Sequence, residues 1–203
     1  MFRPAAALAT AIALAAAPAV AEQLACEGPF AIDSSEARLV ETFGRDNVVT
    51  GEVDGPEGTT MIATTVFPDD PEHSFQVVWW DEEALDSPSF FTLAPADTAP
   101  GGLRLGMPLA EVEALNGEPF TMLGFGWDYG GAASFASGQL SALPGDCLLS
   151  VSFDPSTALP EGTDAEPIEG DKEVASNLPL LRAVEPVVYE VRFGYPHPDF
   201  RAD

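Results

Sequence analysis

Residues Leu103 to Gly131, LRLGMPLAEVEALNGEPFTMLGFGWDYGG, carry the clearest structural pattern in this chain. Apolar side chains at Leu109, Val112 and Leu115 recur at helical spacing, and Asn116-Gly117 follows them as a helix end. The next residues alternate aromatic side chains with glycines, a period of two that is typical of a strand. The stretch therefore predicts a short helix followed at once by a strand.

A helix with the same spacing is predicted 72 residues earlier, counted from Ala37 to Leu109. Ala37, Val40 and Phe43 form its apolar stripe, residues 33–36 offer capping side chains, and Gly44 ends it. We interpret the chain as two tandem units, each a helix followed by antiparallel strands. The expected fold class is α+β, with the helices on one face of the sheet.

The units are expected over residues 22–98 and 99–203, with an acidic, mobile loop at 155–171 in the second. Turn residues delimit the strands of both units. The expected strands are 47–52, 61–67 and 74–80 in the first unit, and 120–127, 132–137, 147–153 and 187–195 in the second.

Strand alternation suggests which aromatic side chains are available for binding. Trp79 and Trp80 are adjacent, so they cannot enter the same core, and the polar neighbours of Trp80 make it the exposed one. Phe125, Trp127 and Tyr129 are expected as a ladder on one face, opposite the glycines. This ladder is either core or, if a helix covers the glycine side, an exposed protein-binding surface.

The last strand shows a similar alternation. One face is expected to hold the larger apolar set: Val187, Tyr189, Val191, Phe193 and Tyr195. Glu190 and Arg192 are expected on the opposite, solvated face.

These motifs carry a family resemblance. The string NGEPFTMLGFGWDYGG at 116–131 resembles a set of uncharacterised exported bacterial proteins. The helix and strand motif resembles the small module of outer-membrane-assembly lipoproteins, and in tandem that of the β-lactamase inhibitory protein. The matching residues are Gly106, Met107, Leu109, Glu111, Val112, Gly117, Pro119, Trp127 and Tyr129. The resemblance implies a binding or assembly module without catalytic residues.

The first residues read as a secretory signal. Arg3 is followed by an apolar run and by Ala19-Val20-Ala21, a cleavage site, so residues 1–21 are predicted to be removed. Lipidation at Cys26 is an alternative, but Gln23 stands where a lipoprotein signal has leucine. We expect a periplasmic or secreted protein without membrane insertion.

Cys26 and Cys147 are the two cysteines of the chain, and in an exported protein they predict a disulfide. Such a bond closes a loop of 121 residues. The chain-entropy model assigns a loop of that length about 4 to 5 kcal/mol of stabilisation. Two free thiols are the alternative.

The chain is strongly acidic, with 33 Asp and Glu residues against 8 Lys and Arg and a net charge of −25. Such a field repels nucleic acids and anionic lipid surfaces, so neither is expected as a partner. The acids are dispersed and no EF-hand spacing occurs, which favours a solvated acidic surface over a cation site.

No catalytic constellation stands out. His73 and His197 lie in short turn-like segments without a companion motif, and no G-x-S-x-G elbow occurs. We therefore expect no catalytic residue, no cofactor and no metal ligand. The expected function is a non-catalytic exported protein-binding module, in its sharpest form an inhibitor of a periplasmic or secreted hydrolase. The alternatives are an envelope-assembly or scaffold factor and an acidic hydrolase using paired carboxylates.

Overall fold

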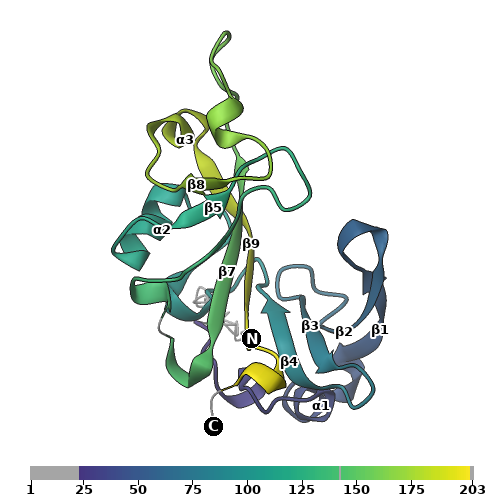
Figure 1. Cartoon of the computed structure of the whole chain (residues 1–203). Helices are drawn as coiled ribbons and strands as arrows, with labels where there is room; N and C mark the ends of the chain where they lie inside the picture. The colour runs from purple at the N-terminus through teal and green to yellow at the C-terminus, as the bar shows by residue number, and fades with distance from the viewer. Residues whose placement is uncertain (1–22, 142, 202–203) are drawn as a thin grey trace, which may run out of the picture.

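Strand pairing dominates the structure, a computed structural model that describes residues 23–141 and 143–201. Nine strands form one antiparallel sheet in the order β1-β2-β3-β4-β9-β7-β6-β5-β8 (Figure 1). The strands are β1 (Val48–Asp54), β2 (Thr60–Val66), β3 (Phe75–Asp81), β4 (Asp86–Thr92), β5 (Thr121–Leu123), β6 (Ala132–Ser134), β7 (Leu148–Pro155), β8 (Glu173–Ala175) and β9 (Pro186–Gly194). The predicted signal segment and its cleavage site lie outside the described residues.

Both predicted helices are present, as α1 (Glu36–Phe43) and α2 (Leu109–Asn116). Ser35 caps α1 by accepting a hydrogen bond from the Arg38 N–H at 3.3 Å, and Gly117 ends α2 in the left-handed conformation. The buried stripe of α1 differs from the prediction. Leu39 is fully buried, and Val40 and Phe43 are partly buried against the same core, whereas Ala37 is exposed.

Two strands and one α-helix were absent from the sequence prediction: β4, β8 and α3 (Pro179–Val184). The start of β4 reads Asp-Ser-Pro-Ser, a composition typical of a turn, and Pro88 has no N–H to donate to a neighbouring strand. β8 is only three residues long, so its sequence offers almost no alternation to recognise.

The register of the sheet separates two faces. Val77, Phe91, Phe193 and Leu149 lie side by side on β3, β4, β9 and β7, and all four are buried. On this side the Phe43 ring of α1 lies 5.7 Å from that of Phe75.

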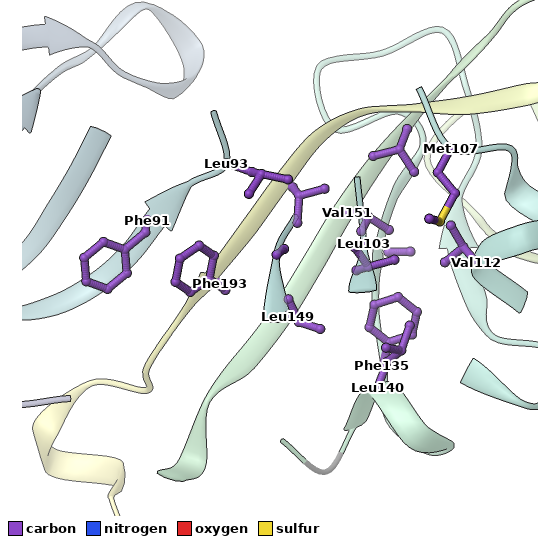
Figure 2. Close-up of a cluster of buried hydrophobic side chains, with 14 of the residues drawn as sticks. Phe91, Leu93, Leu103, Met107, Val112, Phe135, Leu140, Leu149, Val151 and Phe193 are labelled. Atoms are coloured by element: carbon purple, nitrogen blue, oxygen red, sulfur yellow. The ribbon is translucent and has the colours of Figure 1, made fainter. Parts of the chain in front are cut away.

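The second helix packs on the same face. Val112 of α2 belongs to the same buried cluster as Val151 of β7 (Figure 2). We call this the helix-covered face, and the opposite side the open face.

The strands β4 and β9 join the two parts of the chain into this single sheet. Phe90 pairs with Gly194, and Phe91 with Phe193, whose stacked rings lie 5.2 Å apart (Figure 2). A Cβ on Gly194 would lie 2.0 Å from the carbonyl oxygen of Ser89, so the close approach of β4 requires glycine there. The sheet is therefore continuous across the unit boundary predicted at residues 98 and 99.

A bulge in β9 corrects the predicted alternation of the last strand. Ser152 pairs with Glu190 and Phe153 with Val188, so Tyr189 is the extra residue. Val191, Phe193 and Tyr195 are buried as predicted. For the residues that precede the bulge, the extra residue reverses the predicted order of buried and exposed positions. Val188 is buried, whereas Tyr189 is 53% exposed.

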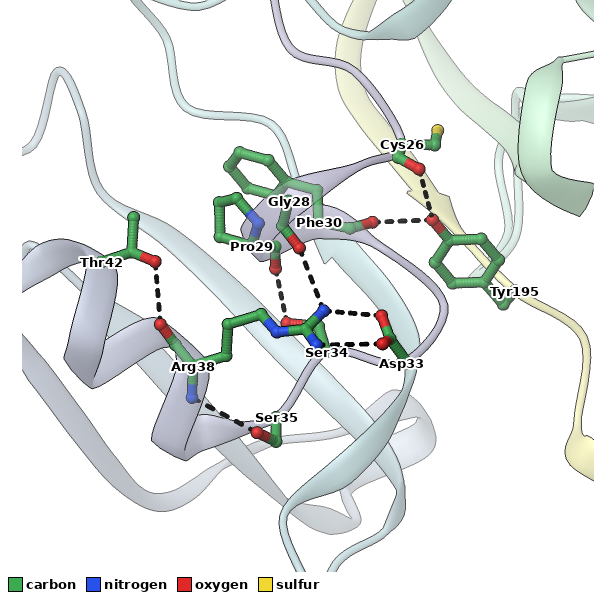
Figure 3. A network of polar contacts seen from close by, with 10 residues as sticks. All are labelled: Cys26, Gly28, Pro29, Phe30, Asp33, Ser34, Ser35, Arg38, Thr42 and Tyr195. Carbon is green, nitrogen blue, oxygen red and sulfur yellow. Dashed lines mark hydrogen bonds and ion pairs between the residues drawn. The ribbon is translucent and has the colours of Figure 1, made fainter.

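The predicted disulfide is present between Cys26 and Cys147, whose Cα atoms lie 6.1 Å apart. It ties the segment that precedes α1 to the residue before β7. Tyr195 holds the same segment from the end of β9, donating hydrogen bonds to the carbonyl oxygens of Phe30 at 2.7 Å and Cys26 at 3.3 Å (Figure 3). Burial raises the pKa of the Tyr195 phenol to about 12.

The predicted acidic loop at 155–171 is attached to the fold near its end. Ile168 is buried, and its carbonyl oxygen accepts a hydrogen bond from the Phe125 N–H at 2.8 Å. The Gly170 N–H donates back to the Phe125 carbonyl at the same distance. One apolar side chain and these backbone bonds therefore anchor the end of a segment with an otherwise polar composition.

We expect Gly194→Ala to lower the free energy of unfolding by about 1–3 kcal/mol, because the added methyl group overlaps the backbone of β4. Gly51→Ala is the matched control, since its Cβ would meet nothing within 4 Å. It should change stability by less than about 0.5 kcal/mol. Denaturant unfolding measures both, and equal effects of the two changes would contradict this account of the junction.

The raised pKa of Tyr195 predicts an alkaline loss of stability. The neutral phenol is favoured in the folded protein, so its contribution is complete below the ordinary pKa of 10 and disappears as the pH rises from 10 to about 12. Unfolding measurements on wild type and Tyr195→Phe should show a stability difference that shrinks across this range. A difference that stays constant with pH would refute this role of the phenol.

Candidate functional site

The open face of the sheet displays large apolar side chains to solvent. Val49 of β1 and Leu148 of β7 are 53% and 52% exposed, and the register places both on this face. Trp80, which follows Val78 by two residues on β3, is 41% exposed. Tyr189 stands at the bulge beside Glu190. These four residues belong to four different strands, so the apolar exposure is spread across the open face.

A row of polar side chains crosses the middle of the open face. The Gln76 N–H donates to the Thr92 Oγ1 at 2.8 Å, and the ladder continues this row through five neighbouring strands. Its members are Thr65, Gln76, Thr92, Arg192 and Ser150. The adjacent row is mainly apolar and consists of Ala63, Val78, Phe90, Gly194 and Leu148.

Arg192 lies at the centre of the open face, because β9 is the central strand of the sheet. The sequence predicts only that Arg192 lies on the side of its strand opposite Val191 and Phe193. Its guanidinium lies over the Phe90 ring at 4.7 Å, and its Nη2 donates to Glu190 at 2.8 Å. The Arg192 Nε is buried without a hydrogen-bond partner among the described residues. The cation–π contact and the ion pair thus hold the guanidinium over the Phe90 ring.

The two adjacent tryptophans separate as predicted. Trp79 is buried on the helix-covered face, where its indole N–H donates to the Thr64 hydroxyl at 2.9 Å. Trp80 points to the open side, and its indole N–H donates to the Tyr195 carbonyl at 3.0 Å. The His197 ring meets Trp80 edge-on at 5.1 Å between centroids.

The predicted ladder of Phe125, Trp127 and Tyr129 does not form. The strand expected at 120–127 is only β5, because the chain leaves the sheet at Gly124. A Cβ on Gly124 would lie 2.6 Å from the Gly170 carbonyl oxygen, so another backbone does approach this glycine. Phe125 is buried, Trp127 is half-buried and Tyr129 is 41% exposed. The three side chains therefore share no common face.

Trp127 and Tyr129 instead form the rim of a loop. Their rings meet edge-on at 5.4 Å, and the Trp127 indole N–H donates to the Gly124 carbonyl at 2.8 Å. The Tyr129 hydroxyl donates to Glu57 at 3.1 Å. Glu57 lies in the connection between β1 and β2, so loops from distant strands meet here (Figure 1).

Both histidines contact aspartates of their own turns. His73 lies 2.9 Å from Asp70, and this hydrogen bond raises the pKa of His73 and lowers that of Asp70. The His197 Nδ1 accepts a hydrogen bond from the Asp199 N–H at 3.2 Å. Over residues 23–141 and 143–201, no group of three His, Cys, Asp or Glu side chains could hold a metal ion.

None of the described carboxylates is fully buried. The Glu113 side chain is 15% exposed. It accepts a hydrogen bond from the Ser176 hydroxyl at 2.7 Å and forms an ion pair with Arg182. Ser176 also accepts a hydrogen bond from the Phe120 N–H at 2.9 Å. This network connects α2, α3 and the ends of β5 and β8, so we assign it a structural role.

No family model, curated protein or solved structure matches this chain.

Sequence reasoning missed Val49, Leu148 and Tyr189 as surface residues. Val48-Val49 and Leu148-Leu149 are pairs of similar apolar residues, so alternation alone could not tell which member faces the helices. Alternation along β9 predicts the wrong face for Tyr189, because the bulge depends on pairing with β7. The two pairs still indicate an exposed apolar residue in each strand, since adjacent side chains point to opposite faces and only one member of each pair can lie in the core.

The bond between Tyr129 and Glu57 can be tested by titration. Accepting from the phenol, Glu57 raises the pKa of Tyr129 above its ordinary value of 10. Glu57→Gln keeps an acceptor oxygen but removes the charge, so we expect the pKa of Tyr129 to fall toward that value. An NMR titration of the Tyr129 ring carbon measures the shift. Asp128→Asn is the control, and an equal effect of the two changes would argue against the direct bond.

Proposed function

We propose that this chain is an exported, non-catalytic protein-binding module that engages its partner through the open face of the sheet. One observation supports this most strongly: exposed Val49, Trp80, Leu148 and Tyr189 lie on the side of the sheet that α1 and α2 leave uncovered. Exposed apolar side chains that share one uncovered face of a sheet suit an interaction surface.

The composition of the face suits a protein partner. Aromatic and arginine side chains dominate binding energy at protein interfaces, and this face offers Trp80, Tyr189 and the stacked Arg192. The sheet also holds these side chains on hydrogen-bonded strands, which limits the conformational entropy lost on association. Inhibition of a periplasmic or secreted hydrolase is the sharpest form of the proposal.

Two other functions remain as alternatives. An envelope-assembly or scaffold factor would use the same face without affecting any enzyme. An acidic hydrolase would need two close carboxylates in a dry cleft. Glu113, whose side chain is only 15% exposed, is bonded to Arg182 and Ser176, an arrangement that suits a structural role.

We further propose that the chain is exported with residues 1–21 as its signal. The disulfide between Cys26 and Cys147 supports an oxidising compartment. None of the described helices has the length and apolar character needed to cross a membrane.

The tandem-unit interpretation and the resemblance to lipoprotein and inhibitor modules also remain proposals. In support, α1 precedes β1 to β4, and α2 precedes β5, β6, β7 and β9. The last strand of each set, β4 or β9, pairs with the other at the centre of the sheet.

Site-specific photo-crosslinking in the native host tests the binding face. A photoreactive phenylalanine analogue is placed at Val49, Leu148 or Tyr189 on the open side, and at Ala37 or Ala110 as exposed controls on the helices. We expect one protein to be crosslinked from all three open-side positions and from neither control. Equal crosslinking from the helices would exclude the open face as the binding surface.

The purified partner then tests the function itself. Wild-type protein should bind it, and should block its activity if it is a hydrolase. Folded Trp80→Ala should bind at least about tenfold more weakly, as expected for an interface anchor. Binding without inhibition would support the assembly alternative, and unchanged binding of Trp80→Ala would exclude Trp80 as an anchor.

A further inference from the structure

A hollow of about 450 Å³ lies at the Trp80 end of the open face. Its walls come from the turn between β3 and β4 and from the residues that follow β9. The residues that line the hollow include Trp80, Asp81, Glu82, Glu83, Asp86 and His197. Aromatic and acidic groups thus face a common space.

The aromatic wall offers a ring surface rather than a hydrogen-bond donor. The indole N–H of Trp80 is already bonded to the Tyr195 carbonyl, and the edge-on contact with His197 holds the ring from a second side. Trp80 as a whole residue is nevertheless 41% exposed. A fixed, exposed indole is the best aromatic partner for a cation, since the negative face of its π system attracts positive charge.

The acids of the hollow, Asp81, Glu82, Glu83 and Asp86, have no ion-pair partner among the described residues. Asp81 also shapes the turn, accepting hydrogen bonds from the N–H groups of Glu83 at 3.1 Å and Ala84 at 2.8 Å.

The spacing of these acids does not suit a metal ion. No three acidic or histidine groups of the described chain converge as metal ligands would. The negative charge is instead spread around a hollow, which suits a larger organic cation.

We propose that this hollow binds the guanidinium of an arginine side chain presented by the protein partner. A guanidinium is planar, stacks on aromatic rings and pairs with carboxylates, so it matches both walls. The overall charge of −25 favours a basic surface on the approaching protein. This inference rests on the proposed function, because it names the chemistry that the partner brings to the Trp80 end of the open face.

NMR with a small probe tests the hollow without the partner. Nα-acetyl-arginine amide is titrated into the folded protein while the three tryptophan indole N–H signals are followed. Trp79 and Trp127 are internal controls, because their indoles are bonded to Thr64 and Gly124 away from the hollow. We expect a saturable shift of the Trp80 signal alone. Nα-acetyl-citrulline amide, a neutral analogue of similar shape, should leave all three signals unchanged.

Matched variants distinguish the effect of the acids at the hollow from the effect of the overall negative charge of the protein. Glu82→Gln with Glu83→Gln should weaken binding of the arginine probe about three- to tenfold, because two negative charges beside the guanidinium are lost. Glu118→Gln with Glu161→Gln removes the same charge from exposed positions outside the hollow and should leave the affinity unchanged. A Trp80→Phe variant should retain binding, whereas Trp80→Leu should lose most of it, followed through the backbone amide of residue 80.

Equal shifts of the three indoles, equal binding of the citrulline analogue, or equal weakening by both double variants would overturn the proposal. So would binding of Ca²⁺ that displaces the arginine probe at the same site. These outcomes are independent of the crosslinking result. A partner crosslinked from Val49 and Tyr189 without arginine binding would refute this inference alone, while arginine binding without open-face crosslinks would refute the proposed function.

Discussion

The pairing of β4 with β9 is the contact on which the rest of the structure depends. It joins residues 86–92 to residues 186–194, with Gly194 allowing the backbone of β4 to approach and Phe91 stacked on Phe193 beneath it. Without this ladder, β1 to β4 and the remaining strands would be two small sheets with two edges at the centre. With it, one hydrophobic core and one open face extend across the molecule.

The same junction assembles the candidate binding surface. The chain that leaves β9 brings the Tyr195 carbonyl to the Trp80 indole and places His197 against its ring. The Tyr195 side chain meanwhile reaches the opposite side, where it holds the segment next to the Cys26–Cys147 disulfide. Tyr195 therefore holds the N-terminal segment of the described fold with its side chain and the most exposed tryptophan with its carbonyl oxygen.

The open face combines exposed apolar side chains with charged side chains. The protein carries few cations, and Arg192 is held at the centre of the face by Phe90 and Glu190. The acids near Trp80 have no such partner among the described basic residues. A partner that complements this pattern needs apolar contact area together with positive charge at one end, which restricts the proteins that can fit.

The sequence by itself determined the local elements: both main helices with their glycine ends, most strands, the cysteine pair and the opposite facing of Trp79 and Trp80. Each depends on neighbouring residues or on simple periodicity. Only the tertiary structure decided the features that need a partner strand, namely the β4–β9 junction, the bulge that turns Tyr189 outward and the exit of the chain from the sheet at Gly124. Alternation fails at these places because bulges and backbone contacts are set by residues far away in the chain.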